Sequence, residues 1–152
     1  MPSRAEPLVE AALEEGFDLA SLGPATSPPD AAAFDRWLGA GRDAPGIGYV
    51  RRNRERILGP GRLLRGARSI LSLAVGHARA PGGFRGGGRV ARYALGRDYH
   101  RVVGKMLRRL MRRLRGSGLA KVSRAVVDAG PILERSHAAR AGIGFQGKSA
   151  NS

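Results

Sequence analysis

The segment 99–115 constrains the fold more than any other part of the chain. Its apolar residues recur at steps of one and three, which places them on one face of a helix; they are Val102, Val103, Met106, Leu107, Leu110, Met111 and Leu114. The basic residues of the segment, with no acid among them, are Arg101, Lys105, Arg108, Arg109, Arg112, Arg113 and Arg115. Because an apolar face of this width needs a partner, we expect this helix to build the core and to expose a basic face.

This basic face belongs to a chain with a large positive surplus. The formal net charge is +15, and 24 of the 27 basic residues are arginine, whose planar guanidinium suits phosphate groups. Such a charge attracts polyanions, which favours a nucleic-acid partner. Two other interpretations stay open, a solvated outer face in a protein rich in arginine through codon bias and a helix on a membrane surface. The membrane interpretation ranks last, because the core needs the apolar face.

The composition predicts one domain, or part of a larger one, without membrane spans or disulfides. The 152 residues are 42% apolar, which is enough for a buried core, and no run of 18 apolar residues is present. The chain has no cysteine, so disulfides and thiolate metal sites are excluded within it. The histidines show no metal-ligand spacing, and we expect no metal site. Acids in the N-terminal stretch argue against a secretory signal, which favours the cytoplasm.

Shorter patterns predict an α+β fold with a mixed sheet and flanking helices. Residues 69–75 and 121–127 are rich in Val, Ile and Leu and are predicted as strands, and a strand end is expected within 17–29. Four further helices are predicted, at 6–15 before Gly16, from Asp30 to Leu38 with Gly39 closing, within 46–58 after Tyr49, and at 132–141 ending at Gly142.

The C-terminal segment Gly142 to Ser149 matches two nucleotide-binding patterns. It reads GIGFQGKS, which satisfies G-x-x-x-x-G-K-[ST] and, over its first six residues, G-x-G-x-x-G. Both patterns need a strand before them and a helix after them. Here a predicted helix comes first, and only three residues follow Ser149. We therefore expect Gly142 to cap a helix and no nucleotide to bind.

Asp128 is the best single candidate for chemistry. It is predicted to lie at the carboxyl end of a strand, where ligand sites gather in α/β sheets. A partly buried carboxyl at this point could exchange a proton near neutral pH. An Asx-turn with Gly130 is the simpler alternative, and the residues alone favour it. Asp98, at the entry of the basic helix, is explained as its N-cap.

Two segments carry a resemblance to a known family. ARYALGRDYHRVVGKML and VDAGPILERSHAARAGIGFQGKS resemble epoxyqueuosine reductase, whose patterns are ARYA-x-G-x-DYH, VDTGP-x-LER and RAG-x-G-x-x-GKN. The resemblance starts near GFDLASLGPA and continues in order through most of the chain. It implies an oxidoreductase with a nitroreductase-like core that uses cobalamin and iron–sulfur clusters to reduce epoxyqueuosine to queuosine in tRNA. It also implies a cytoplasmic protein, which we expect to be monomeric.

The resemblance assigns roles to individual residues. Asp128 of VDAGP is implied as the catalytic proton donor beside the opened epoxide and as part of the cofactor site. Asp98 and Tyr99 of GRDYH are implied to line the corrinoid pocket. Arg51 and the backbone near Ala91 are implied to contact the cofactor, and Arg135 to hold Asp128 or an anionic group.

The chain departs from the family pattern at two positions and at its end. Thr is replaced by Ala129 and Asn by Ser149, and either change would loosen the pocket. The family continues into a ferredoxin-like region whose cysteines bind two [4Fe–4S] clusters, and then into helical repeats. We therefore expect residues 1–152 to be a truncated N-terminal cobalamin-binding domain, inactive alone. A non-catalytic RNA-binding module and a corrinoid-binding module remain the alternatives.

Overall fold

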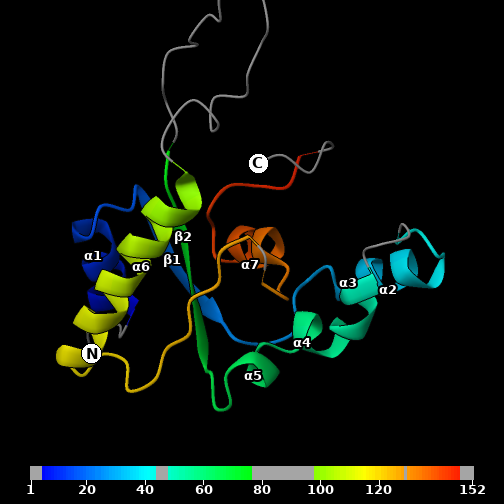
Figure 1. Ribbon diagram of the computed structural model, residues 1–152, viewed down its shortest axis with the longest axis horizontal. Coiled ribbons are helices and arrows are strands. Elements are labelled where there is room, and N and C mark those ends of the chain that lie inside the picture. The colour runs from blue at the N-terminus through cyan, green and yellow to red at the C-terminus, as the bar shows by residue number, and fades with distance from the viewer. Residues whose placement is uncertain (1–4, 44–47, 77–97, 129, 148–152) are drawn as a thin grey trace, which may run out of the picture.

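The computed structural model describes residues 5–43, 48–76, 98–128 and 130–147. Its strands are β1 (Leu19–Pro24) and β2 (Ser69–Ala74), and its helices are α1 (Ala5–Glu14), α2 (Ala31–Gly39), α3 (Gly48–Arg52), α4 (Arg54–Leu58), α5 (Pro60–Leu63), α6 (Tyr99–Gly116) and α7 (Glu134–Arg140) (Figure 1). The α+β class is therefore confirmed. The described sheet is an antiparallel pair rather than a mixed sheet, with Leu22 opposite Leu71.

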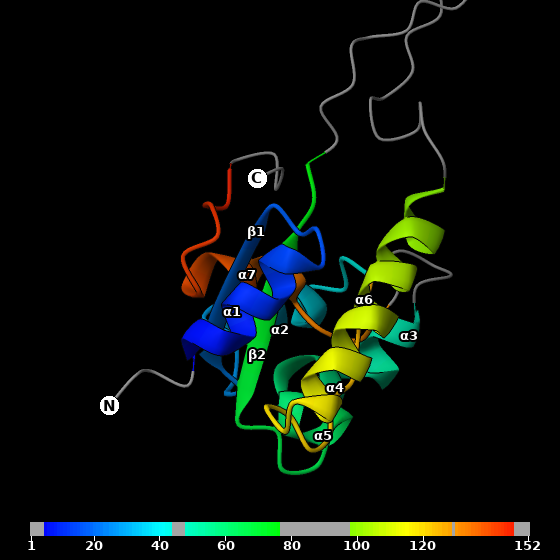
Figure 2. The same ribbon diagram turned by 90° about the vertical axis from the view of Figure 1, so that its left-hand side faces the viewer.

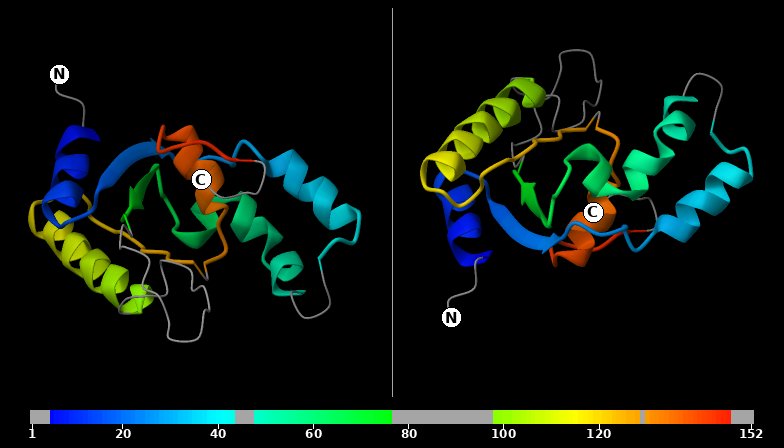
Figure 3. Two further views of the ribbon diagram at one scale, coloured as in Figure 1. Left: turned by 90° about the horizontal axis from the view of Figure 1, so that it is seen from above. Right: turned by 90° about the horizontal axis from the view of Figure 1, so that it is seen from below.

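The two strands separate the helices into two groups. α1 and α6 lie together on one side of the pair, α7 lies on the other, and α2 to α5 extend beyond it (Figures 1 and 3). A view from the side shows α6 running next to α1 (Figure 2). The chain returns to the strands twice from distant positions, which brings α6 and α7 close to the N-terminal third.

The core forms where the apolar face of α6 meets α1 and Phe17. Its buried members are Ala11, Ala12, Phe17, Met106, Leu110 and Leu114, and Leu71 and Leu73 of β2 pack against them. The prediction that 99–115 builds the core is confirmed. The four-residue spacing of Met106, Leu110 and Leu114 puts all three on the side that faces the strands.

α7 is held by polar contacts of its C-terminal half. Arg140 donates to the backbone oxygens of Pro24 and Ser27 and to the Thr26 hydroxyl, at 2.6, 2.8 and 3.0 Å. Gly142 follows the helix at φ 83°, a left-handed conformation that glycine adopts without strain. A helix therefore precedes GIGFQGKS, as predicted, and this context is wrong for a phosphate loop; Lys148 and Ser149 lie outside the described residues.

One strand prediction was wrong, and two predicted helices differ from the structure in their bounds. Residues 121–127 form an extended segment without a strand, and Val122 is 68% exposed. A strand needs a hydrogen-bonded neighbour as well as β-branched residues, and in the described parts of the chain only β1 and β2 pair. The predicted helix after Tyr49 divides into α3 and α4 at Asn53. α7 begins at Glu134, two residues later than the predicted start at 132.

Candidate active site

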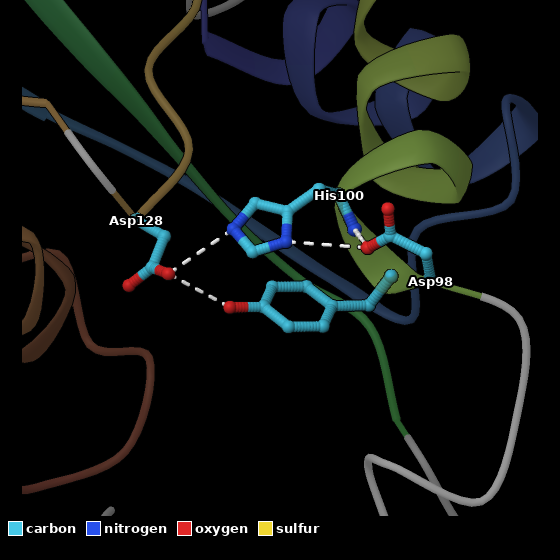
Figure 4. A network of polar contacts seen from close by, with 4 residues as sticks. Asp98, His100 and Asp128 are labelled. Atoms are coloured by element: carbon cyan, nitrogen blue, oxygen red, sulfur yellow. Dashed lines mark hydrogen bonds and ion pairs between the residues drawn. The ribbon is translucent and has the colours of Figure 1, made fainter.

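A polar cluster forms where the extended segment before α7 meets the start of α6. The Asp128 Oδ2 atom accepts a hydrogen bond from the Tyr99 hydroxyl at 2.8 Å and lies 3.1 Å from Nε2 of His100 (Figure 4). The three side chains come from positions 28 and 29 residues apart. The structure thus joins the GRDYH and VDAGP segments, the two parts of the chain that carry the family resemblance.

Asp98 completes this cluster from the other side of the histidine. Its Oδ1 atom accepts the backbone N–H of His100 at 3.0 Å, which caps α6, and lies 3.3 Å from Nδ1 of the same ring. The N-cap prediction is therefore confirmed. Each carboxylate accepts only, so His100 donates to both at once only when both of its nitrogens carry a proton. The arrangement is a carboxylate–imidazole–carboxylate chain that can pass a proton along its length.

The Tyr99 ring stacks against the imidazole of this chain. Its centroid lies 4.0 Å from that of His100, with 30° between the planes. The stack fixes the imidazole orientation while the Tyr99 hydroxyl holds Asp128. Tyr99 and His100, neighbours at the start of α6, therefore contact the same carboxylate.

The backbone at Asp128 is in an unusual conformation. Its φ of 54° lies in the left-handed region, which aspartate tolerates better than most residues. Two residues later, a Cβ on Gly130 would come within 1.8 Å of Cγ1 of Val126, so a side chain there forces the segment to move. The predicted strand end at Asp128 is replaced by this tight bend, which turns the carboxyl toward α6.

The contacts of Asp128 determine its charge. The hydrogen bond from Tyr99, followed by that from His100, lowers the pKa of the Asp128 carboxyl below its ordinary value. The side chain is 61% exposed, so the expectation of a partly buried carboxyl was wrong. At neutral pH Asp128 is a solvated carboxylate in this structure. A bound ligand that displaced its water would raise the pKa again.

A second acid, Glu134, lies close to Asp128. The surrounding protein displaces water from this surface carboxyl and raises its pKa, and the negative charge of Asp128 acts in the same direction. The backbone of Asp128 opposes this rise by hydrogen bonding to Glu134. Sequence reasoning did not single out Glu134, although it stands next to Arg135 in the LER motif. His100 was not singled out either.

Two other predicted cofactor residues, Arg51 and Arg135, do not join this cluster. Arg51 pairs with Asp43 at 2.6 Å and donates to the Leu38 carbonyl at 2.8 Å, which fixes α3 to the end of α2. Arg135 is exposed on the first turn of α7. Ala91 and Ala129 lie outside the described residues. Of the predicted set, Asp98, Tyr99 and Asp128 are brought together.

A basic cavity opens on the side of the same segment that faces α3 to α5. Its volume is about 450 Å³, and its lining residues are Tyr49, Asn53, Arg56, Arg62, Leu63, Arg124 and Pro131. Arg124 crosses to the α5 side and donates to the Leu63 carbonyl at 3.2 Å. Pro131 stands three residues after Asp128, so one segment contributes to both the polar cluster and the cavity.

No group of three or more His, Cys, Asp or Glu side chains in the described part of the chain is arranged to hold a metal ion. None of the described helices has the length and apolar character that crossing a membrane requires.

Comparison with known proteins assigns the family. The family model for "Epoxyqueuosine reductase QueG, DUF1730" matches residues 58–129, from the end of α4 to the Asp128 bend. The epoxyqueuosine reductase of Synechococcus sp. strain RCC307 is 35% identical over 151 residues, which cover 97% of this chain and 46% of that protein. The chain belongs to the epoxyqueuosine reductase family. It spans about half the length of the curated relatives it matches.

Solved structures of epoxyqueuosine reductases have the same fold. One, in complex with an epoxyqueuosine-modified tRNA-Tyr stem loop, superposes with a TM-score of 0.70 at 26% identity, covering 95% of this chain and 40% of that one. Another, from Bacillus subtilis, has its catalytic aspartate loop swung out of the active site; its TM-score is 0.63 at 26% identity, covering 95% and 39% of the two chains. The resemblance identified from the sequence motifs is confirmed.

Proposed function

We propose that this chain contributes the proton-donating part of an epoxyqueuosine reductase active site, with Asp128 as the catalytic acid. The observation that carries the proposal is that the Tyr99 hydroxyl and the His100 ring both contact the Asp128 carboxylate. The bent backbone at Asp128 agrees with it, because strained conformations gather at functional sites. A catalytic aspartate on a mobile loop in the B. subtilis relative is the second support.

The reaction removes the epoxide oxygen of a tRNA nucleoside by reduction. Two electrons and two protons convert the epoxide to a carbon–carbon double bond and water. Asp128 would give a proton to the oxygen as its bond to carbon breaks, so that it leaves as a neutral group rather than as an alkoxide. His100 is placed to return a proton to Asp128, since its ring touches Asp98 on one side and Asp128 on the other.

The lowered pKa of Asp128 sets a condition on this role. A carboxylate that is ionised in the free protein must gain a proton before it donates one. Docking of the modified nucleotide over Asp128 would exclude water from a side chain that is 61% exposed, which disfavours the charged form. The same water exclusion would make proton uptake from His100 favourable.

The cofactors implied by the family fit this chain unequally. Cobalamin would supply the reducing electrons at the epoxide carbon. The cavity presents three guanidinium groups, an amide and a phenol, which suit the amide and phosphate groups on the rim of that cofactor. Its volume of about 450 Å³ accommodates one edge of such a molecule. The [4Fe–4S] clusters do not fit, because they need cysteine thiolates and this chain has none.

The cavity also refines the predicted cofactor residues. Asp98, Tyr99 and Asp128 would face the reacting end of the cofactor, and Arg56 and Arg124 would hold its rim. Arg51 and Arg135 have a weaker case, since neither lines the cavity. We further propose the nitroreductase-like core of the family, a monomeric state and, with tRNA as the substrate, a cytoplasmic location.

Single turnover of a modified tRNA stem loop tests the role of Asp128. The protein is reconstituted with cobalamin, and a strong one-electron chemical reductant takes the place of the iron–sulfur clusters that this chain cannot bind. Queuosine formation is followed by mass spectrometry. Asp128→Asn should reduce the rate at least about 100-fold, the usual scale for loss of a general acid, while stem-loop binding persists. Glu10→Gln, which removes one exposed carboxylate far from the cluster, is the matched control.

The outcomes separate the alternatives. If Asp128→Asn turns over like the wild type, the catalytic assignment is wrong. If the wild type binds the stem loop and shows neither turnover nor a change in the cobalamin visible spectrum, the non-catalytic RNA-binding module is favoured. A spectral change without turnover favours the corrinoid-binding module.

A further inference from the structure

We propose that five cations on the outer face of α6 bind the backbone phosphates of the tRNA, an inference that rests on the proposed tRNA substrate. The five side chains, called here the α6 stripe, are Arg101, Lys105, Arg108, Arg112 and Arg115. All five are exposed. The proposal names a surface for the RNA outside the polar cluster and the cavity.

The spacing of these residues aligns them. They recur at steps of four, three, four and three, which keeps them on one side of a helix. At 1.5 Å per residue the stripe is about 21 Å long. It lies opposite the buried face formed by Met106, Leu110 and Leu114, so packing of the core turns it outward. A row of this length can meet several consecutive phosphates of a nucleic-acid strand.

The two basic residues of α6 that lie outside the stripe form ion pairs with acids at the end of α1. Arg109 donates to the Glu15 carboxylate at 2.8 Å, and Arg113 pairs with Glu14. Both arginines point toward α1, and their charge is balanced there. By contrast, no member of the stripe has an acidic partner within the described residues. The seven basic residues of α6 therefore divide into two that hold the fold and five that remain available.

The chemistry of the stripe selects a phosphate backbone as its occupant. Four of its five members are arginines, whose fork of N–H groups binds phosphate oxygens in pairs. A membrane-surface helix would need a broad exposed apolar face beside its cations, but Met106, Leu110 and Leu114 are buried against α1 and the strands. The large apolar side chains that α6 exposes are those of Tyr99 and Val102, both in its first turn. A repeating row of cations with exposed apolar neighbours at one end alone complements a polyanion better than a membrane surface.

The position of the stripe connects it to the proposed reaction. Its first member, Arg101, follows directly after His100, which touches Asp128. α6 then carries the remaining cations away from the cluster along one straight axis (Figure 2). A strand whose modified nucleotide reaches Asp128 would bring its neighbouring phosphates within range of the start of the stripe.

A pair of matched double variants tests the proposal. Arg108→Gln with Arg112→Gln removes two charges from the middle of the stripe. Arg36→Gln with Arg42→Gln removes two exposed charges at α2, at the other end of the molecule (Figures 1 and 3). Binding of a fluorescein-labelled tRNA-Tyr anticodon stem loop is measured by anisotropy at several salt concentrations. Circular dichroism and the melting midpoint verify the fold of each variant.

We expect the stripe variant to bind at least about tenfold more weakly at 0.1 M salt, and the slope of log K against log salt to fall by about two. The α2 variant should lose much less affinity at equal net charge. Equal losses in the two variants would overturn the stripe, because they would show a response to net charge alone. Arg101→Gln with Arg115→Gln repeats the comparison if the first pair alters the fold.

The same assay distinguishes failure of the stripe from failure of the proposed function. A wild type that does not bind the stem loop contradicts tRNA as the substrate, and with it the stripe. Asp128→Asn should bind like the wild type, so its loss of turnover cannot be confused with loss of the stripe. Binding to phosphatidylserine vesicles that is as strong as RNA binding, and as sensitive to the stripe variant, would assign the surface to a membrane instead.

Discussion

The body formed by α1, β1, β2 and α6 is held together differently from the segment α2 to α5. In the body, six buried apolar residues form one cluster. In the α2 to α5 segment the buried residues are scattered, namely Leu38, Ile57 and Pro60. Partly exposed ion pairs tie its helices instead, Arg51 to Asp43 and Arg54 to Asp35. The stability of the body should therefore fall most when a buried side chain is shortened. The stability of the α2 to α5 segment should depend more on salt and pH.

The largest expected effect comes from the centre of the body. Leu110 is 2% exposed, so Leu110→Ala leaves a cavity among side chains that cannot close it. We expect the free energy of unfolding to fall by about 2–5 kcal/mol, measured by urea denaturation. Val122→Ala shortens a side chain that is 68% exposed and should change stability by less than about 0.5 kcal/mol. Similar losses in the two variants would contradict the placement of the core.

The next effect concerns the bend that presents Asp128. Gly130→Ala places a methyl group 1.8 Å from Cγ1 of Val126, and the segment must move to relieve the overlap. We expect a loss of about 1–3 kcal/mol in unfolding free energy and a fall in the epoxide-reduction rate of the reconstituted protein. Gly61→Ala is the control, since a Cβ there meets nothing within 4 Å. Wild-type activity in Gly130→Ala would mean that the bend is dispensable.

A smaller effect is expected from the ion pairs of the α2 to α5 segment. Arg54 donates twice to Asp35, at 2.6 and 2.5 Å, and lowers the pKa of that carboxyl. The stabilisation is present above the ordinary aspartate pKa and is lost as the pH falls through the lowered folded value. Arg54→Gln should shift the urea midpoint by a small fraction of the Leu110→Ala shift, and 1 M salt should remove most of the difference. A difference in urea midpoint that stays the same at 1 M salt would contradict this account.

The smallest effect is a change in titration at the polar cluster. Tyr99→Phe removes the hydrogen bond that contributes most to lowering the pKa of Asp128, so that pKa should rise toward its ordinary value. The carboxyl resonance of Asp128, followed by NMR between pH 2 and 7, measures the change. Val102→Ala alters an exposed residue of the same helix and should leave the titration unchanged. An unchanged Asp128 titration in Tyr99→Phe would show that Tyr99 does not hydrogen-bond to Asp128.

Local patterns predicted the body better than the site. The helix at 99–115 and the strand at 69–75 agree with α6 and β2 within one or two residues, because each has a strong periodic or continuous apolar pattern. The strand at 121–127 failed because pairing depends on neighbours in space, which β-branched residues alone do not reveal. Helix spacing likewise identified the cations of α6 but not that α1 neutralises two of them.

The site needed both motif and structure. The VDAGP and GRDYH motifs identified Asp128, Asp98 and Tyr99, and the structure brings these three together. His100 was missed because its partner is 28 residues away, and nothing in the local sequence distinguishes it from a surface histidine. The exposure of Asp128 was also missed, since its burial had been inferred from a strand that does not form. Contacts between distant segments, rather than residue types, decide these points.

Because α6 is one straight helix, it sets fixed distances between the polar cluster and the cations of the stripe. A helix fixes both the distance and the angle between any two of its residues, so His100 and Arg115 are separated by about 22 Å along one axis. One inserted residue in the middle of α6 would rotate everything after it by about 100°. That single change would turn Arg112 and Arg115 away from their row and carry Leu114 out of the core, while leaving Tyr99 and His100 at Asp128. The number of residues in α6 therefore matters to the site as much as the identity of its side chains.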